Sequence, residues 1–135
     1  MTDVNIVVGC DPEVFIYDTK KEEFISAHGL IPGTKQDPHI VDKGMVQVDG
    51  MAAEFGIDPA STEDEFVDNI RVVMRQLSSM IPKNCILRAE PVAHFSDTIM
   101  LAQPEEALEL GCEPDFNCYT MKANPRPNAE ALNFR

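Results

Sequence analysis

Four acidic side chains have the spacing expected of ligands for a divalent cation. Asp11 and Glu13 are two residues apart beside an apolar segment, and Asp49 and Glu54 lie in a second apolar region. Residues two apart on an extended chain point to the same side, so strands can bring such carboxylates onto one face of a sheet. Mg²⁺ is commonly held by one or two carboxylates together with substrate phosphates and water. The four residues are therefore candidate magnesium ligands, although a chain with 23 acidic residues also brings some acids together by chance.

Glu54 is the strongest single candidate among them. Its neighbours in the sequence are apolar and have the pattern of a buried strand. An acidic side chain in a buried strand needs a hydrogen-bonding partner or a metal ion to offset its desolvation.

Two basic residues in a long irregular segment, residues 28–44, are candidates for substrate binding. His28 and Lys35 flank a stretch containing glycine and proline, where they could clamp an anionic substrate. The alternative is a mobile surface loop, since loops of this length are either functional or disordered. The stretch does not match a phosphate loop, because its spacing is one residue short and its Lys and Thr are in reverse order.

The four cysteines indicate free thiols. None forms a C-x-x-C pair, and the histidines are not at zinc-finger spacing. The N-terminus has no basic start and no long apolar stretch, so we expect no secretory signal and a cytoplasmic protein with reduced thiols. No Ser-His-Asp or Cys-His arrangement is recognisable, and the catalytic residues are unassigned.

A hairpin centred on residues 49–50 is the clearest local prediction. Residues 45–48 and 51–57 are rich in apolar side chains and flank Asp-Gly, which tolerates the positive φ angles of a tight turn. With Asp-Gly as the loop, Val48 is opposite Met51. Alternation along the strands then puts four side chains on one face: Met45, Gln47, Ala52 and Glu54.

A helix is predicted over residues 62–81. Thr62 and Glu65 match a capping box, and acidic residues lie in the first turn, where the helix dipole favours them. Pro82 bounds the other end. Apolar side chains recur at helical spacing: Phe66, Ile70, Val73, Met74 and Leu77.

The remaining segments predict strands at residues 4–8, 13–17, 24–27 and 85–90, a short helix at 104–110 and turns at 124–128. We therefore expect one domain over residues 1–135 with an α+β fold. In this fold a mostly antiparallel sheet carries one long amphipathic helix, residues 62–81, packed on a face.

Composition and charge exclude several function classes. The chain is 44% hydrophobic and 25% charged, which is typical of a globular domain. Its 11 basic and 23 acidic residues give a net charge of −12, so direct binding to a nucleic-acid backbone is not expected. No apolar run is long enough to span a bilayer, and no membrane partner is expected.

Four sequence blocks, read in order, resemble the N-terminal half of a phage-encoded carboxylate–amine ligase family. That family belongs to the glutamine-synthetase-like, glutamate–cysteine-ligase-like fold group. The blocks are GCDPEVF (9–15), SAHGLIPGTK (26–35), VQVDGMAAEF (46–55) and LGCEPDF (110–116).

The resemblance implies an amide-forming ligase that uses ATP and Mg²⁺. In such enzymes a carboxylate is phosphorylated and an amine then attacks the acyl phosphate, so the expected partners are small-molecule or peptide carboxylates and amines. The fold implied is a curved antiparallel sheet whose concave face carries the carboxylates that hold magnesium. By this resemblance Glu13 and Glu54 match the acidic positions on the first and second strands, with Asp11 and Asp49 assisting. The two basic residues of the long loop would contact substrate.

Members of this family continue with a Gly-Gly-His-x-His strand and a second half, so the resemblance covers the N-terminal portion of the fold. The alternative function is a non-catalytic protein with a truncated ligase fold that binds a host protein or self-associates. Half of such a sheet would leave an exposed strand edge, which favours pairing with another chain.

Overall fold

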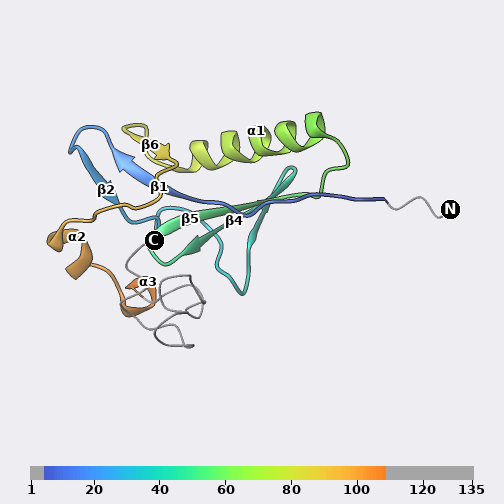
Figure 1. Ribbon diagram of the computed structural model, residues 1–135. Helices are drawn as coiled ribbons and strands as arrows, with labels where there is room; N and C mark the ends of the chain where they lie inside the picture. Colours follow the sequence, from blue (N-terminus) through green and yellow to red (C-terminus); the bar gives the residue numbers. More distant parts are fainter. Residues whose placement is uncertain (1–4, 109–135) are drawn as a thin grey trace, which may run out of the picture.

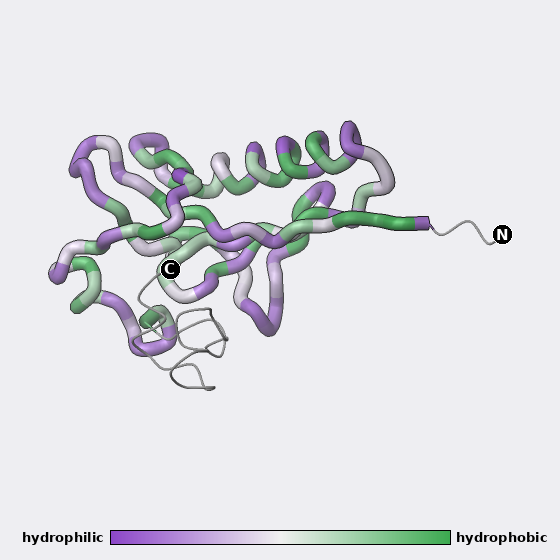
Figure 2. The backbone as a smooth tube through the Cα atoms, viewed as in Figure 1, coloured by the Kyte–Doolittle hydropathy of each residue, from purple (hydrophilic) through white to green (hydrophobic). Residues whose placement is uncertain are grey.

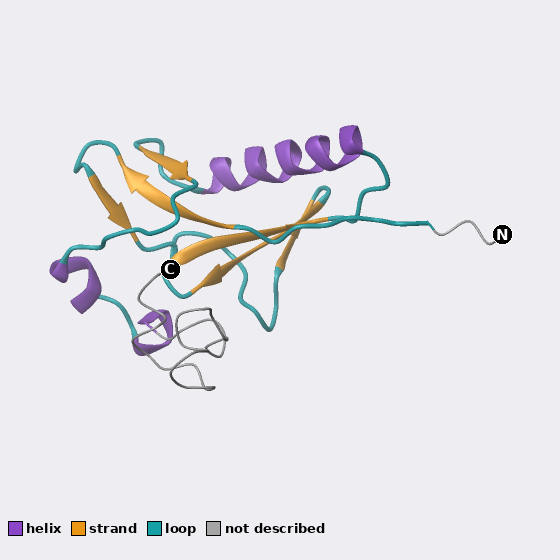
Figure 3. Cartoon of the chain, in the orientation of Figure 1, coloured by secondary structure: helices purple, strands orange, loops and turns teal. Residues whose placement is uncertain are grey.

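The structure, a computed structural model, describes residues 5–108 and contains one six-stranded sheet and three helices in this range (Figures 1 and 3). The elements in chain order are β1 (Glu13–Asp18), β2 (Glu23–Ile25), β3 (His39–Val41), β4 (Gly44–Asp49), β5 (Ala52–Ile57), α1 (Glu63–Met80), β6 (Cys85–Arg88), α2 (Asp97–Leu101) and α3 (Glu105–Leu108).

Strand β1 connects the two parts of the sheet. It pairs with β5 at its start and with β2 and β6 along the rest of its length. Strands β4 and β3 continue from β5, which gives the order β2-β1-β5-β4-β3. Every pairing is antiparallel, so the predicted α+β class with an antiparallel sheet is confirmed at this level.

Helix α1 begins at the predicted cap. Thr62 has an extended backbone, and its hydroxyl accepts a hydrogen bond from the backbone N–H of Glu65 at 3.2 Å. The Glu65 carboxylate in turn accepts from the backbone N–H of Ser61 at 2.7 Å. The helix ends before Ile81, which has an extended backbone because Pro82 follows it.

The hydrophobic core lies between α1 and one face of the sheet. Val73 and Leu77 of α1 are fully buried there. Figure 1 shows α1 lying along this side, whereas α2 and α3 lie on the other side of the sheet. The strand residues that contribute to the core are Val14, Ile16, Val46, Ala53, Phe55, Ile57 and Cys85. Because side chains alternate along a strand, the residues between these positions point to the face away from α1.

The predicted pairing within the hairpin is wrong. The loop consists of Gly50 and Met51 rather than residues 49–50, and Val48 is opposite Ala53. Gly50 takes the left-handed conformation that the turn needs, with φ of +58°, while Met51 is buried. Since each residue's partner moves by two positions, every side chain keeps its predicted face.

Three other expectations differ from the structure. The segment 28–44 contains a strand, β3, and residues 97–101 form α2, neither of which the sequence predicted. Residues 5–8 form no strand, and Val8 makes only an isolated bridge with Ala60. The sequence block at 110–116, the turns at 124–128 and the last two residues of the predicted helix 104–110 lie outside the described residues. Among the described helices, none is long and apolar enough to cross a membrane.

Candidate functional site

Glu13 and Glu54 lie directly opposite each other on neighbouring strands. Glu13 of β1 pairs with Glu54 of β5, and Glu54 is in turn opposite Gln47 of β4. Directly paired residues point to the same face, so the three side chains form one row across the sheet on the face away from α1. The structure therefore brings together the two acids that the resemblance matched to metal-binding positions.

The hydrogen-bonding pattern brings the two carboxyl-bearing residues especially close. The backbone N–H of Phe55 donates to the carbonyl of Pro12 at 3.2 Å, so Pro12 and Phe55 are a hydrogen-bonded pair of the antiparallel ladder. The next pair along, Glu13 with Glu54, is then of the non-hydrogen-bonded kind, whose Cα atoms are only about 4.5 Å apart. Two like charges directly opposite each other on neighbouring strands destabilise the strand pair.

Gln47 is a further oxygen donor that the sequence analysis did not select. Its side chain is only 5% exposed, whereas Glu54 is half-buried and Glu13 is exposed. Amide carbonyls are accepted ligands of hard cations, so the row offers two carboxylates and one amide. The same-face prediction for Gln47 and Glu54 was the signal that could have identified it.

Asp11 lies one row away from the acidic pair. The backbone N–H of Ile57 donates to the carbonyl of Cys10 at 3.1 Å, so the ladder continues past Pro12 and sets Asp11 beside Gly56. Asp11 is on the same face as Glu13, as its spacing predicted. Among residues 5–108, however, no three His, Cys, Asp or Glu side chains form a group that could hold a metal ion, and Asp11 does not complete the pair.

Asp49 and Lys35 form an ion pair with each other. The Lys35 Nζ is 3.0 Å from the Asp49 Oδ2, and the Asp49 side chain is only 11% exposed. Asp49 is the last residue of β4, two positions from Gln47 and on the same face. Lys35 therefore lies on the same face as the acidic pair. It forms an ion pair with Asp49, which the sequence analysis had assigned as a metal ligand.

His28 is separate from this group and lies beside α3. Its Nε2 is 3.7 Å from the Glu106 carboxylate, and its backbone N–H donates to the Ser26 hydroxyl at 3.1 Å. His28 and Lys35 were predicted to clamp an anionic substrate, and in the structure each of them lies next to an acidic side chain of the protein.

The two cysteines in the described range are free thiols with no sign of nucleophilic activation. Burial, followed by the negative charge of Asp11, raises the pKa of the Cys10 thiol. Burial, followed by the charge of Asp18, raises the pKa of Cys85. Both thiols therefore stay protonated at neutral pH.

An aromatic cluster continues the face beyond Glu13. Phe15 and Tyr17 alternate with the core residues of β1, and their rings make edge contacts with Phe24 at centroid distances of 6.0 and 5.2 Å. The Arg88 guanidinium lies 4.6 Å from the centre of the Tyr17 ring and its Nε is 3.1 Å from the Glu90 carboxylate. The sequence analysis did not identify this cluster, although the alternation of Glu13, Phe15 and Tyr17 was visible.

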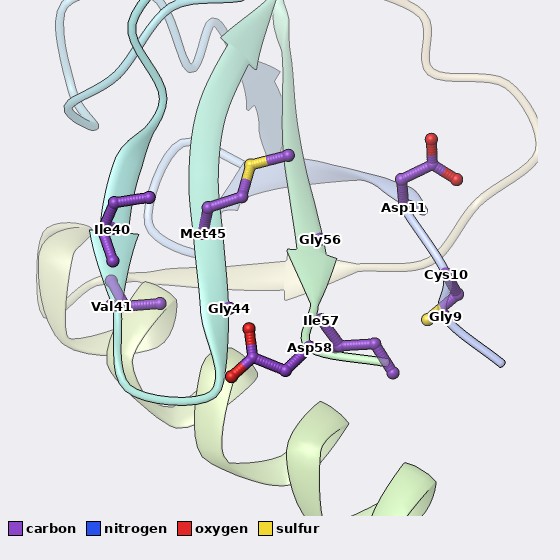
Figure 4. A pocket seen from close by; sticks show the side chains of 10 residues that line it. All are labelled: Gly9, Cys10, Asp11, Ile40, Val41, Gly44, Met45, Gly56, Ile57 and Asp58. Atoms are coloured by element: carbon purple, nitrogen blue, oxygen red, sulfur yellow. The ribbon is translucent and has the colours of Figure 1, made fainter. Parts of the chain in front are cut away.

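An open cavity of about 510 Å³ lies on the side of the Glu13–Glu54–Gln47 row that is away from the aromatic cluster, where β4 and β5 meet the segment before β1 (Figure 4). Its lining residues are Gly9, Cys10, Asp11, Ile40, Val41, Gly44, Met45, Gly56, Ile57 and Asp58.

No family model, curated protein or solved structure matches the chain. The resemblance to the ligase family therefore rests on the sequence blocks themselves.

Proposed function

We propose that this chain carries a magnesium site of an ATP-dependent carboxylate–amine ligase, with Glu13 and Glu54 as the metal-binding pair. The proposal includes the finer fold assignment, in which the antiparallel sheet is part of a glutamine-synthetase-like fold. The observation that carries it is the direct pairing of Glu13 with Glu54 on the face away from α1.

The chemistry of the row fits a magnesium ion that also contacts phosphate. Two carboxylates supply the protein ligands that Mg²⁺ usually takes, and substrate phosphates and water complete its coordination. When bound, the ion would neutralise phosphate charge and polarise a phosphoryl oxygen. Such a cation is needed here because the protein has a net charge of −12, which by itself repels ATP.

Among the described residues, Lys35 is positioned to contact an anionic substrate on the same face. The Lys35 side chain is 39% exposed while its ammonium group pairs with Asp49. An exposed lysine can exchange a protein carboxylate for a substrate carboxylate or phosphate with little loss of charge pairing. Asp49 then acts as the group that positions Lys35, and we leave it out of the metal-binding set.

The metal site is tested with Mn²⁺ as a paramagnetic substitute for Mg²⁺. In amide NMR spectra of the full chain, substoichiometric Mn²⁺ should first broaden the signals of Glu13, Gln47 and Glu54. The variants Glu13→Gln and Glu54→Gln should each weaken this effect at least tenfold in Mn²⁺ concentration. Asp68→Asn is the matched control, because it removes one exposed negative charge from α1 on the other side of the sheet. Equal broadening in Glu54→Gln and the wild type would contradict the site.

A second titration separates the metal site from the ligase assignment. With ATP present, Mn²⁺ should bind this row at a lower concentration, because phosphate oxygens add ligands. If ATP leaves the Mn²⁺ concentration needed for binding unchanged, Glu13 and Glu54 remain the metal ligands but the ligase assignment is contradicted.

The second candidate function, self-association or binding of another protein, is supported by exposed strand edges. Among the described residues no strand pairs with the outer side of β3, where Ile40 is 76% exposed. The arm before β1 exposes three consecutive large apolar residues, and Figure 2 shows this arm as a continuous hydrophobic stretch. They are Ile6, Val7 and Val8.

A further inference from the structure

The floor of the cavity is formed by the glycine backbone at Gly56 and the side chain of Met45. Gly56 lies opposite Met45, and a Cβ added at Gly56 would approach the Met45 side-chain methyl to 3.0 Å. A Cβ at Gly44 would collide with the Gly56 carbonyl oxygen. The lack of a side chain at Gly56 leaves room for the Met45 side chain, and Figure 4 shows this side chain extending across toward Gly56. The result is an apolar surface on which a carbon chain can lie.

All charged groups among the described lining residues are negative. They are Asp11 and Asp58, and both are exposed. The neighbouring Cys10 is a neutral thiol, and the remaining lining residues are glycines and apolar side chains. An apolar surface with carboxylates at its margin complements a ligand that has a carbon chain and a positively charged end. It repels carboxylates and phosphates.

The cavity also has a defined position relative to the proposed metal pair. Met45, Gly56 and Asp11 lie one row, or two residues, beyond Gln47, Glu54 and Glu13 on the same face. At the usual rise of a strand this separation is about 7 Å. A ligand group held at Asp11 therefore lies next to the cation that would bind ATP and the activated carboxylate.

We propose that this cavity binds the amine substrate, with its ammonium group held by the Asp11 carboxylate and its carbon chain lying over Gly56 and Met45. The assignment rests on the proposed ligase function, and it names the class of amine: a primary amine with an apolar chain. Asp11 then belongs to the amine site rather than to the metal site, which accounts for its position one row from the acidic pair.

The test uses hexylammonium as the probe, with 1-hexanol and hexanoate as matched neutral and anionic compounds. Binding to the full chain is followed by amide NMR in buffer containing EDTA, so that the result does not depend on the metal site. Hexylammonium should shift the signals of Asp11, Met45 and Gly56, and the other two compounds should bind at least tenfold more weakly. Equal binding of hexylammonium and hexanol would overturn the role of charge.

Three variants locate the site. Asp11→Asn should weaken hexylammonium binding about tenfold, whereas Asp68→Asn on α1 should change it less than twofold, because it alters only the overall charge. Gly9→Leu should block the cavity. The fold can accommodate a side chain at Gly9, since its φ is not positive and the nearest atom to an added Cβ is the Ile57 carbonyl oxygen at 3.7 Å.

The outcomes distinguish the two proposals. Equal affinities in wild type, Asp11→Asn and Gly9→Leu would overturn the amine site whatever the metal titration shows. Hexylammonium binding that is lost in both variants supports the amine site, and failure of the Mn²⁺ titration in the same preparation would then count against the metal pair alone.

Discussion

Asp18 illustrates how one buried carboxylate can hold a turn together. It is the last residue of β1 and is only 6% exposed. Its Oδ1 accepts hydrogen bonds from the backbone N–H groups of Lys20 and Lys21 at 2.9 and 3.1 Å. Burial acts to raise the pKa of Asp18, but these two hydrogen bonds, one from the Asn84 side chain and the charge of Lys21 outweigh it, so the pKa is lowered.

This lowered pKa predicts a specific dependence of stability on acid. The contribution of Asp18 is fully present above the ordinary carboxyl pKa of 3.8 and is lost as the pH falls through the lower value of the folded state. The Asp18→Asn variant should be less stable than the wild type at neutral pH, and the difference should shrink as the pH falls below about 4. Urea unfolding at pH 7, 4 and 3 measures this change. A constant difference across the three pH values would show that the charge of Asp18 contributes nothing.

At the same scale, local spacing predicted some site residues and not others. Asp11 and Glu13 share a face because alternation along an extended chain is a local property. The ion pair of Asp49 with Lys35 could not be predicted from spacing, because Lys35 is brought to Asp49 by a loop whose path is set by tertiary contacts. The selection of Glu54 by its apolar neighbours was correct in placing it on a half-buried strand.

The loop that precedes β3 is held against β4 by Gly33. The Gly33 carbonyl accepts a hydrogen bond from the backbone N–H of Val48 at 3.2 Å. Its φ is +89°, and a Cβ there would collide with the Val46 carbonyl oxygen and lie 2.7 Å from the His39 nitrogen. Glycine is needed at this position for both its backbone angle and its lack of a side chain.

Gly33→Ala and Gly29→Ala form a matched pair that separates these two requirements. Gly29 also has a positive φ, of +77°, but no atom lies within 4 Å of an added Cβ. Gly29→Ala should therefore lower the free energy of unfolding by about 1 kcal/mol from backbone strain alone. Gly33→Ala adds a steric clash with backbone and should cost at least about 2 kcal/mol. The midpoints of urea unfolding measure both losses of stability. Equal losses in Gly33→Ala and Gly29→Ala would contradict the close approach of backbone atoms to Gly33.

The elements show why some of the fold could be predicted and some could not. Helix α1 has local signals at its start, along its length and at its end, and its bounds of Glu63–Met80 lie within one residue of the predicted range. Strand β3 has three residues and becomes a strand only because β4 is beside it, so no periodicity could reveal it. The pairing within the β4–β5 hairpin depended on which of two neighbouring dipeptides forms the turn, and the Asp-Gly preference selected the wrong one.

On the scale of the whole molecule, net charge and exposed apolar edges oppose each other. A net charge of −12 on 135 residues repels a second copy of the chain. The β3 edge with Ile40 and the arm before β1 favour strand pairing with another chain. Salt decides between these two effects, because the screening length falls from about 30 Å at 0.01 M to about 3 Å at 1 M ionic strength.

We therefore expect a monomer at low salt and association through the β3 edge as salt is raised. Light scattering coupled to gel filtration at about 0.02 and 0.5 M NaCl measures the mass in each condition. Ile40→Lys should keep the protein monomeric at both concentrations, because a charged side chain on an edge strand opposes pairing. Leu101→Lys is the matched control, since Leu101 is 87% exposed on α2 and belongs to no strand edge. If both lysine variants suppress association equally, the effect comes from general surface charge and not from the β3 edge. If the wild type stays monomeric at high salt, self-association through this edge is contradicted.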